Sequence, residues 1–188
     1  LLHIIDIYKP DYIFAPKSIQ DELNLSEYKN HLPFENHFFS KRKVFFNCGI
    51  NPELSVLLPT SGSMGSPKFV RLSKNNISSN TASIIKYLNI SSNEKAVTNM
   101  SISYSYMFSI INSHLSSGAS LLITNRSLIE KKFWEEAREF EITSFSGVPF
   151  MYDILLKLGL EKTWIPSIKY FTQAGGKLND DKSLKIID

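Results

Sequence analysis

Hydrophobic and polar positions alternate along the chain in two different patterns. Short apolar runs bounded by Gly, Pro, Asn or Ser predict β-strands, and longer segments with apolar residues every three to four positions predict helices. Strands are expected at residues 12–15, 44–48, 54–58, 69–72, 96–99, 120–124, 143–146 and 168–172. Helices are expected at residues 1–8, 16–25, 74–88, 104–115, 128–140 and 147–158, with another starting near 180. Residues 27–42 are polar and aromatic without a clear period, which predicts a loop.

The order of these elements predicts an α/β fold. Short strands alternating with helices are typical of βαβ units, and therefore of mostly parallel sheets with flanking helices. We expect two partial subdomains, residues 1–92 and residues 93–188, joined by the polar segment 89–95. The first residues resemble the end of a helix and the last residues the start of one, so we expect an internal piece of a longer protein.

Parallel sheets bind ligands at the carboxyl ends of their strands. Three polar or glycine-bearing stretches fall at such positions, namely residues 101–106, 146–147 and 172–176. This placement predicts a pocket at that edge of the sheet. The alternative is that all three stretches are only turns.

The loop between the strands 54–58 and 69–72 has an unusual composition. It reads Thr60-Ser61-Gly62-Ser63-Met64-Gly65-Ser66-Pro67-Lys68. Glycines let the backbone turn through positive φ and expose N–H groups, hydroxyls add donors, and Lys68 adds a positive charge. Such a loop suits a polyphosphate. It is not the Walker phosphate loop, because no Gly-Lys-Ser/Thr opens a helix here; the alternative is a Ser/Gly hairpin turn with no ligand.

Composition narrows the possible functions. The chain has 188 residues, 43% of them hydrophobic and 21% charged, which is typical of a globular domain. The net charge of +3 is too small to indicate nucleic acid by itself, and the basic residues are interleaved with acids. No apolar run is long enough for a membrane span. The single Cys48 allows no internal disulfide, so we expect a reducing, cytoplasmic location. His31 and His37 lack neighbouring ligands, so no metal site is expected around them.

The loop motif and its two apolar flanks resemble the phosphate-loop signature of the adenylate-forming superfamily. This family contains acyl-CoA synthetases, peptide-synthetase adenylation domains and luciferases. The resemblance implies that the ATP phosphates contact Thr60, Ser61, Gly62, Ser63, Gly65 and Lys68. Two positions depart from the family pattern: Met64 stands where the family prefers Ser or Thr, and Phe69 stands where it usually has Gly.

Later landmarks follow in the family's order. Residues 101–107 resemble the segment at the acyl pocket, which implies substrate contacts for Tyr104 and for Met107, which replaces a small Gly. The alternative is that the aromatic residues here are core packing at the start of a helix. The run 174–178 resembles the family's Gly-Gly-x-x-Leu, which implies that Gly175 and Gly176 lie against the adenine and the acyl group. Either Ala174 or Gly175 matches the first Gly.

The resemblance implies the chemistry of the parent protein. This would be an ATP-dependent, AMP-forming acid–thiol ligase, acyl-CoA synthetase-like, which makes an acyl adenylate and pyrophosphate. Its cofactors would be ATP and Mg²⁺, and its partners a carboxylic acid and the thiol of CoA or of a carrier protein. The family's Mg²⁺-binding Glu and catalytic Lys would lie beyond Asp188, so no catalytic residue is expected here and the chain alone should be inactive. The alternative is a relative that binds nucleotide without turnover.

Overall fold

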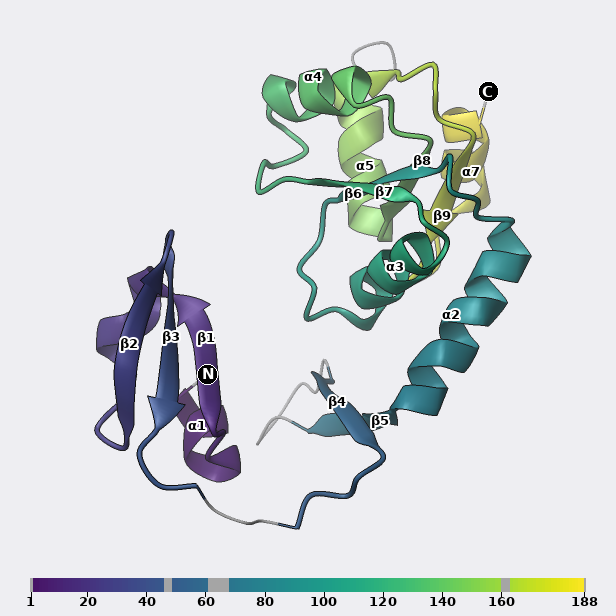
Figure 1. Cartoon of the computed structure of the whole chain (residues 1–188). Coiled ribbons are helices and arrows are strands. Elements are labelled where there is room, and N and C mark those ends of the chain that lie inside the picture. Colours follow the sequence, from purple (N-terminus) through teal and green to yellow (C-terminus); the bar gives the residue numbers. More distant parts are fainter. Residues whose placement is uncertain (1, 46–48, 61–67, 160–162, 188) are drawn as a thin grey trace. The chain divides into compact units, whose positions relative to one another are not determined.

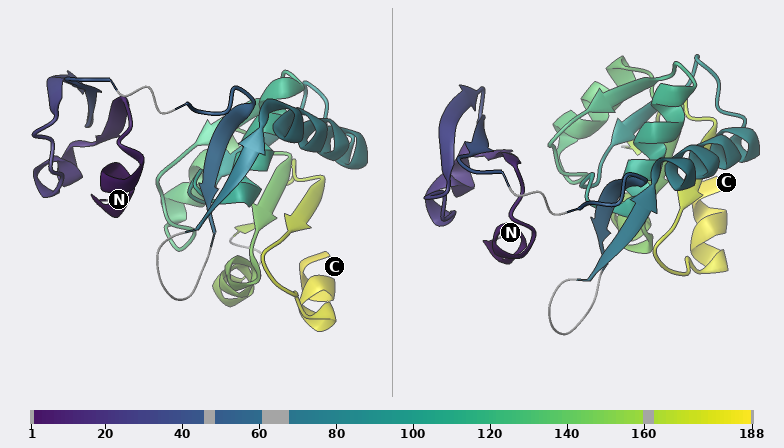
Figure 2. Two further views of the ribbon diagram at one scale, coloured as in Figure 1. Left: turned by 90° about the horizontal axis from the view of Figure 1, so that it is seen from below. Right: turned by 60° about the horizontal axis from the view of Figure 1, so that its bottom comes forward.

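The computed structural model describes residues 2–45, 49–60, 68–159 and 163–187 (Figures 1 and 2). The chain divides into two compact units, Leu1–Asn51 and Pro52–Asp188. The predicted subdomain boundary at residues 92 and 93 lies inside the second unit, in the connection between α2 (Lys74–Leu88) and β6 (Lys95–Thr98). It stays a prediction.

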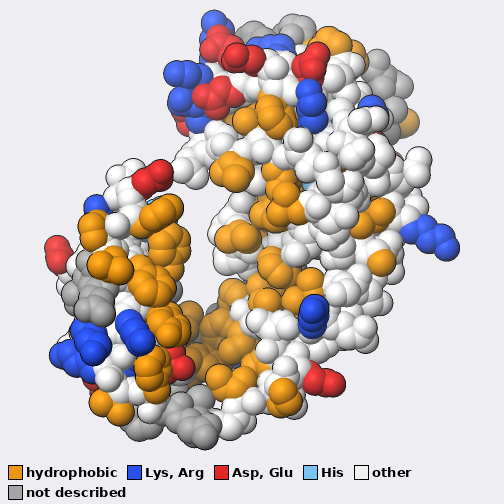
Figure 3. Space-filling model, viewed as in Figure 1, with side chains coloured by type: hydrophobic (Ala, Val, Ile, Leu, Met, Phe, Trp, Pro, Cys, Tyr) orange, Lys and Arg blue, Asp and Glu red, His pale blue; other side chains and the backbone are white. Residues whose placement is uncertain are grey.

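The first unit is a three-stranded antiparallel sheet with two short helices, in the strand order β1-β3-β2. Its elements are α1 (Leu2–Tyr8), β1 (Tyr12–Pro16), the 3-10 helix η1 (Lys17–Glu22), β2 (Tyr28–Phe34) and β3 (His37–Arg42). One face of the sheet forms a small core with Ile13, Ala15 and Phe38. The other face exposes aromatic side chains, and Phe14 among them stacks on His37 with ring centroids 5.0 Å apart. Hydrophobic side chains gather along one side of this unit in Figure 3.

The predicted loop at residues 27–42 is wrong, because these residues form the hairpin of β2 and β3. The alternation of β3 is hidden in the sequence, since its buried positions are Phe38, Ser40 and Arg42. Arg42 tolerates burial because its guanidinium donates to the Lys9 carbonyl at 2.9 Å and contacts the Glu27 carboxylate at 2.6 Å. Of the strand predicted at residues 44–48, the first two residues lie outside any strand, and residues 46–48 lie outside the described residues.

The second unit starts with the antiparallel hairpin of β4 (Leu54–Pro59) and β5 (Phe69–Ser73), which leads directly into α2. Both predicted strands and the predicted helix are confirmed. Ser73 caps α2 because its Oγ accepts from the Asn76 amide at 3.1 Å, while the Asn76 Oδ1 accepts from the Ser73 amide at 3.0 Å. This reciprocal capping box explains why the helix begins at Lys74, directly after the last residue of the strand.

The remainder of the second unit is a parallel four-stranded sheet in the order β7-β6-β8-β9. Besides β6, its strands are β7 (Ser120–Ile123), β8 (Ser144–Gly147) and β9 (Tyr170–Gln173), and its helices are α3 (Ser105–Ser116), α4 (Lys131–Glu139), α5 (Pro149–Leu158) and α7 (Asp180–Ile187). The α/β class is therefore confirmed. This sheet is entirely parallel, whereas the other two sheets of the described residues are antiparallel.

Helices cover both faces of the parallel sheet (Figure 1). The larger core contains Val97 of β6 and Phe145 of β8, together with Phe133 of α4, Leu155 of α5 and Ile186 of α7. The opposite face packs Ala96 against Met107 and Ile110 of α3. Neighbouring residues of β6 thus point to opposite cores, as the two-residue period of a strand requires.

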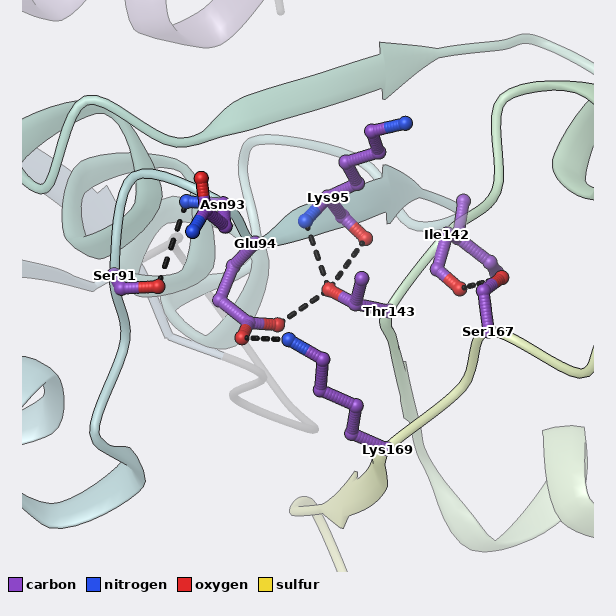
Figure 4. A network of polar contacts seen from close by, with 8 residues as sticks. All are labelled: Ser91, Asn93, Glu94, Lys95, Ile142, Thr143, Ser167 and Lys169. Atoms are coloured by element: carbon purple, nitrogen blue, oxygen red, sulfur yellow. Dashed lines mark hydrogen bonds and ion pairs between the residues drawn. The ribbon is translucent and has the colours of Figure 1, made fainter.

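A polar network ties together the amino ends of three strands (Figure 4). The Glu94 carboxylate, just before β6, accepts from Thr143 Oγ1 and from Lys169 Nζ, which precede β8 and β9. Backbone bonds reinforce the contact, because the Thr143 amide donates to the Lys95 carbonyl at 2.7 Å and the Lys169 amide donates to the Thr143 carbonyl at 2.8 Å. The network fixes the strands at the end of the sheet opposite to their carboxyl ends.

Candidate functional site

The hairpin of β4 and β5 holds the ends of the predicted phosphate loop together. The Thr60 amide donates to the Lys68 carbonyl at 2.9 Å, and Thr60 Oγ1 donates to the same oxygen at 3.1 Å. In this conformation the Thr60 hydroxyl hydrogen is used within the hairpin, whereas the exposed Lys68 side chain stands at the exit of the loop. The predicted contacts Ser61, Gly62, Ser63 and Gly65 lie outside the described residues.

The parallel sheet has a topological switch point between β6 and β8. The chain leaves β6 through α3 to reach β7 on one side, and leaves β8 through α5 toward β9 on the other side. Connections that diverge in this way open a crevice outside the carboxyl ends of the two strands, where α/β proteins bind ligands. A groove of about 1050 Å³ lies beside this point, along the edge strand β7 and past the carboxyl end of β6, and it is lined among others by Asn99, Ser120 and Arg126 but by no residue of β8 or β9.

Side chains from all three predicted stretches lie at this edge of the sheet. The stretch 172–176 is joined by hydrogen bonds to each of the other two, 101–106 and 146–147. Tyr106 of α3 donates its hydroxyl to Thr172 Oγ1 of β9 at 2.7 Å, and Thr172 Oγ1 lies 2.8 Å from Ser146 Oγ of β8. The Asn99 amide nitrogen, just after β6, donates to the Ser146 carbonyl at 2.8 Å. These polar groups therefore form one layer across the ends of β6, β8 and β9.

The phenols of Tyr106 and Tyr152, which both bind Thr172, act as hydrogen-bond donors at neutral pH. Burial raises the pKa of Tyr106, and its hydrogen bonds with Thr172 and Ser146 oppose that rise only partly. Burial also raises the pKa of Tyr152, whose hydroxyl donates to the Thr172 carbonyl at 2.6 Å from the other side of the sheet. Thr172 is thus held by two neutral tyrosines.

The structure separates the two residues predicted to contact substrate. Tyr104 precedes α3 and is 63% exposed, whereas Met107 is fully buried against Ala96 and Ile110. Tyr106, rather than Tyr104, reaches the polar layer. Because α3 starts only at Ser105, successive residues here point in very different directions, which the aromatic spacing alone does not reveal. The substrate roles of Tyr104 and Met107 stay predictions.

Gly175 and Gly176 form a turn that packs closely on the start of α5. Gly175 has a φ of +80°, and a Cβ atom there would lie 3.2 Å from Val148 Cγ1. A Cβ atom at Gly176 would lie 3.2 Å from Pro149 Cγ, and the Gly176 carbonyl accepts from Gln173 Nε2 at 2.5 Å. The turn therefore needs glycine for its own conformation. The predicted contact with adenine or the acyl group stays a prediction.

The sequence did not predict two residues that contact this region, Asn99 in the layer and Tyr152 on the other side of the sheet. Asn99 is the last residue of the predicted strand 96–99. Its place at the carboxyl end of a parallel strand could have identified it as a site residue. Tyr152 lies inside α5 and gives no signal, since its role depends on packing against β9. The described residues contain no group of three His, Cys, Asp or Glu side chains that fits a metal ion. No helix among them is long and apolar enough to cross a bilayer.

The family model of the AMP-binding enzymes matches residues 28–183. The chain therefore belongs to this family. The sequence motif from Thr60 to Lys68 had indicated the same family, and the structural neighbours are adenylate-forming enzymes. A search of curated proteins found no match.

Solved structures of adenylate-forming enzymes share the fold. VinN in complex with L-aspartate is 24% identical, with a TM-score of 0.63 over 73% of this chain and 35% of VinN. MenE from Bacillus subtilis in complex with AMP is 21% identical, with a TM-score of 0.59 over 69% of this chain and 26% of MenE. Apo MatB from Rhodopseudomonas palustris is 21% identical, with a TM-score of 0.60 over 78% of this chain and 29% of MatB. The chain thus spans about a third or less of each of these proteins.

Proposed function

We propose that the full-length protein is an ATP-dependent ligase that activates a carboxylic acid as an acyl adenylate and releases pyrophosphate. The observation that carries this proposal is the convergence of three sequence-distant polar segments at the switch point of a sheet in an AMP-binding family member. MenE was solved with AMP and VinN with L-aspartate, and both share this fold. Their ligands support the proposal that the site binds a nucleotide and a carboxylate.

In the proposed reaction the carboxylate attacks the α-phosphate of ATP. This chemistry depends mainly on orientation and on stabilising negative charge. We assign the β- and γ-phosphates to the loop from Thr60 to Lys68, where the Lys68 ammonium balances their charge. We assign the carboxylic acid to the polar layer around Thr172, close to the turn at Gly175. Mg²⁺ would share the phosphate charge in such a reaction, but the described residues offer it no fitting cluster, so no step is assigned to it.

The finer features of the activity belong to the same proposal. Transfer of the acyl group to the thiol of CoA or of a carrier protein follows from the family resemblance, and a reaction that uses ATP and such thiols fits a cytoplasmic protein. The residues that would complete the catalysis are assigned to other parts of the full-length protein.

A second candidate is a relative that binds nucleotide without turnover. It is favoured by the two departures in the loop region, Met64 in place of a hydroxyl residue and Phe69 in place of a glycine. Met64 removes one donor for the phosphates. This candidate predicts nucleotide affinity without exchange chemistry.

The test is acid-dependent exchange of labelled pyrophosphate into ATP, measured with the full-length protein and pools of carboxylic acids. Exchange that requires one acid pool supports the ligase. Binding of ATP by calorimetry without exchange in any pool supports the second candidate. Neither exchange nor binding would refute both.

A further inference from the structure

One edge of the parallel sheet is open along β7. Of the described strands only β6 pairs with β7, which stands at the end of the order β7-β6-β8-β9. The Ser120 amide donates to the Glu94 carbonyl at 2.9 Å, so the backbone groups of Ser120 point toward the side of β6. Backbone groups alternate between the two sides of a strand. Leu121 and Ile123 therefore direct their amides and carbonyls to the open edge, where no described strand lies.

The groove along this edge is lined mostly by apolar side chains. Leu121 packs against the core beneath α3, and Ile123, two positions further on, lies on the same face of the sheet. Ile123 is 80% exposed and Leu115, near the end of α3, is 59% exposed, and both line the groove together with Phe140, which follows α4. The groove thus joins exposed aliphatic side chains to backbone groups that no described strand covers.

The sequence of β7 carries none of the features that keep a strand edge from pairing. Proteins protect an exposed edge strand with lysine or other charged residues, with proline or with a β-bulge. β7 reads Ser120-Leu121-Leu122-Ile123, and its register with β6 runs over four consecutive residue pairs without a shift. Parallel sheets, moreover, are as a rule buried rather than open to solvent. The edge is therefore suited to receive another strand.

An extended polypeptide segment fits both features of this edge. Its amides and carbonyls repeat at the spacing of a strand and can bond to Leu121 and Ile123, while its apolar side chains fill the groove. A small apolar ligand would fill the groove but leave the backbone groups of β7 without partners. The solved relatives indicate the source of such a segment, because the chain spans only 35% of VinN, 26% of MenE and 29% of MatB.

We infer that a segment of the full-length protein from outside residues 1–188 adds to β7 as a further strand and buries Ile123 and Leu115. A segment of the same polypeptide is favoured over a second copy of the protein, because a tethered strand binds at a high effective concentration and loses little translational freedom. The added strand would close the groove, which then belongs to the interior of the full-length protein and not to its substrate site. The inference does not depend on the proposed ligase function.

Amide hydrogen exchange of the full-length protein, resolved to single residues, tests the inference. The Leu121 and Ile123 amides should exchange at least about 100-fold more slowly than unprotected amides, as the Ser120 amide should through its bond to Glu94. Fast exchange at Leu121 and Ile123 beside slow exchange at Ser120 would show an open edge and overturn the inference. Protection that disappears when a dimer dissociates on dilution would assign the edge to a second copy and would overturn it as well.

A variant then ties the protection to the groove. Ile123→Gln keeps the backbone amide and suits an exposed position, but it places a polar group in the interior if a strand covers the groove. It should raise the exchange rate of the Leu121 amide about 10-fold or more and leave that of Ser120 unchanged. Ile129→Gln is the matched control, because Ile129 is 67% exposed and does not line the groove. Equal Leu121 exchange rates in the two variants would also refute the added strand.

Discussion

Lys169 Nζ lies 2.7 Å from the Glu94 carboxylate, although the two residues are 75 positions apart in the sequence. The Glu94 side chain is 7% exposed and that of Lys169 is 54% exposed. Burial alone would raise the pKa of Glu94, but hydrogen bonds from Lys169 and Thr143 outweigh it and lower that pKa. The carboxylate is therefore held in its charged form at the amino ends of the strands.

Removing the cation of this pair should destabilise the second unit. Lys169→Met leaves a buried carboxylate with only hydroxyl and solvent contacts, and we expect a loss of about 2 kcal/mol, less than for a fully buried pair because Lys169 is half exposed. Glu94→Gln keeps most of the side-chain volume, and the half-exposed Lys169 can then turn its charge to solvent. The loss in the free energy of unfolding should therefore be smaller, about 1 kcal/mol. Denaturant unfolding followed by tryptophan fluorescence measures both, since Trp134 lies in the neighbouring core.

The matched control for Lys169→Met is Lys131→Met. Lys131 pairs with Glu135 at 3.0 Å on the surface of α4, where its side chain is 88% exposed. Exposed pairs of this kind contribute little, so the midpoint of unfolding should hardly move. Equal losses for the two lysine variants would show that the Glu94 pair contributes no more than a surface pair.

Stability should also fall in mild acid because of His114. Its Nδ1 lies 2.8 Å from the Ile110 carbonyl, so Nδ1 carries the hydrogen, and the buried Nε2 has no hydrogen-bond partner among the described residues. Burial lowers the pKa of His114, although the Ile110 bond and the Glu94 charge oppose it. Below the unfolded pKa of about 6.5 the unfolded chain takes up the proton first, so stability decreases as the pH falls from there toward the folded pKa.

The measurement is the thermal midpoint between pH 7.5 and pH 5.5. The wild type should lose stability over this range, and His114→Gln should lose less because it has no proton to bind there. Glu94 adds acid sensitivity in the same direction, but only below about pH 4.5, where the unfolded chain begins to protonate this carboxyl while folding keeps its pKa lower. A wild-type midpoint that stays constant from pH 7.5 to 5.5 would contradict the role given to His114.

Much of the second unit could be predicted because local signals decide it. The helix at residues 74–88 has an N-cap, a regular apolar stripe and Asn89 in the left-handed region with a φ of +54°, and its predicted bounds match α2. The two strands beside the loop were also found, because apolar runs flank a glycine-rich turn. The stretches at the carboxyl ends of the strands followed from the α/β pattern.

What the sequence did not reveal depends on contacts between distant residues. The hairpin of the first unit was missed because Ser40 and Arg42 occupy core positions, and their burial is made possible by partners elsewhere in the chain. The link between Glu94 and Lys169 has no local signature at all. In the candidate site, the choice of Tyr106 over Tyr104 is set by where α3 begins relative to β9, a tertiary feature that aromatic spacing cannot specify.

Loss of the Ser73 cap should weaken the junction between the hairpin and α2. Ser73→Ala removes the acceptor for the Asn76 amide and should cost about 1 kcal/mol. Ser79→Ala on the exposed middle of the same helix is the control, and alanine there should be neutral or slightly stabilising. Hydrogen exchange of the first turn of α2 should rise in the first variant only. Unchanged protection of that turn would mean that β5 alone fixes the start of the helix.

An added methyl group at Gly175 should lower the exchange activity by more than its effect on folding stability explains. Gly175→Ala combines a strained positive φ with a contact of 3.2 Å to Val148 Cγ1, so the turn beside the proposed acyl site must shift. Gly118→Ala is the control, because Gly118 has a φ of +72° but its Cβ would meet only Ser92 Cβ at 3.7 Å, far from the carboxyl ends of the strands. Similar losses of stability are expected, but exchange activity should fall about 10-fold or more only for Gly175→Ala. Equal activity of the two variants would remove the turn from the site.

Removing the charge of Lys68 tests the phosphate loop itself. A charge-assisted contact with phosphate contributes about 1.5–3 kcal/mol, so Lys68→Met in the full-length protein should lower kcat/KM for ATP in the exchange assay about 10- to 100-fold. Lys86→Met is the matched control, since Lys86 is an exposed lysine in the last turn of α2 and should leave the exchange rate unchanged. Thr60→Val should have only a small effect, because the Thr60 hydroxyl hydrogen is already bound to the Lys68 carbonyl. If Lys68→Met and Lys86→Met behave alike while exchange persists, the triphosphate is held by other groups and the loop is a structural hairpin turn.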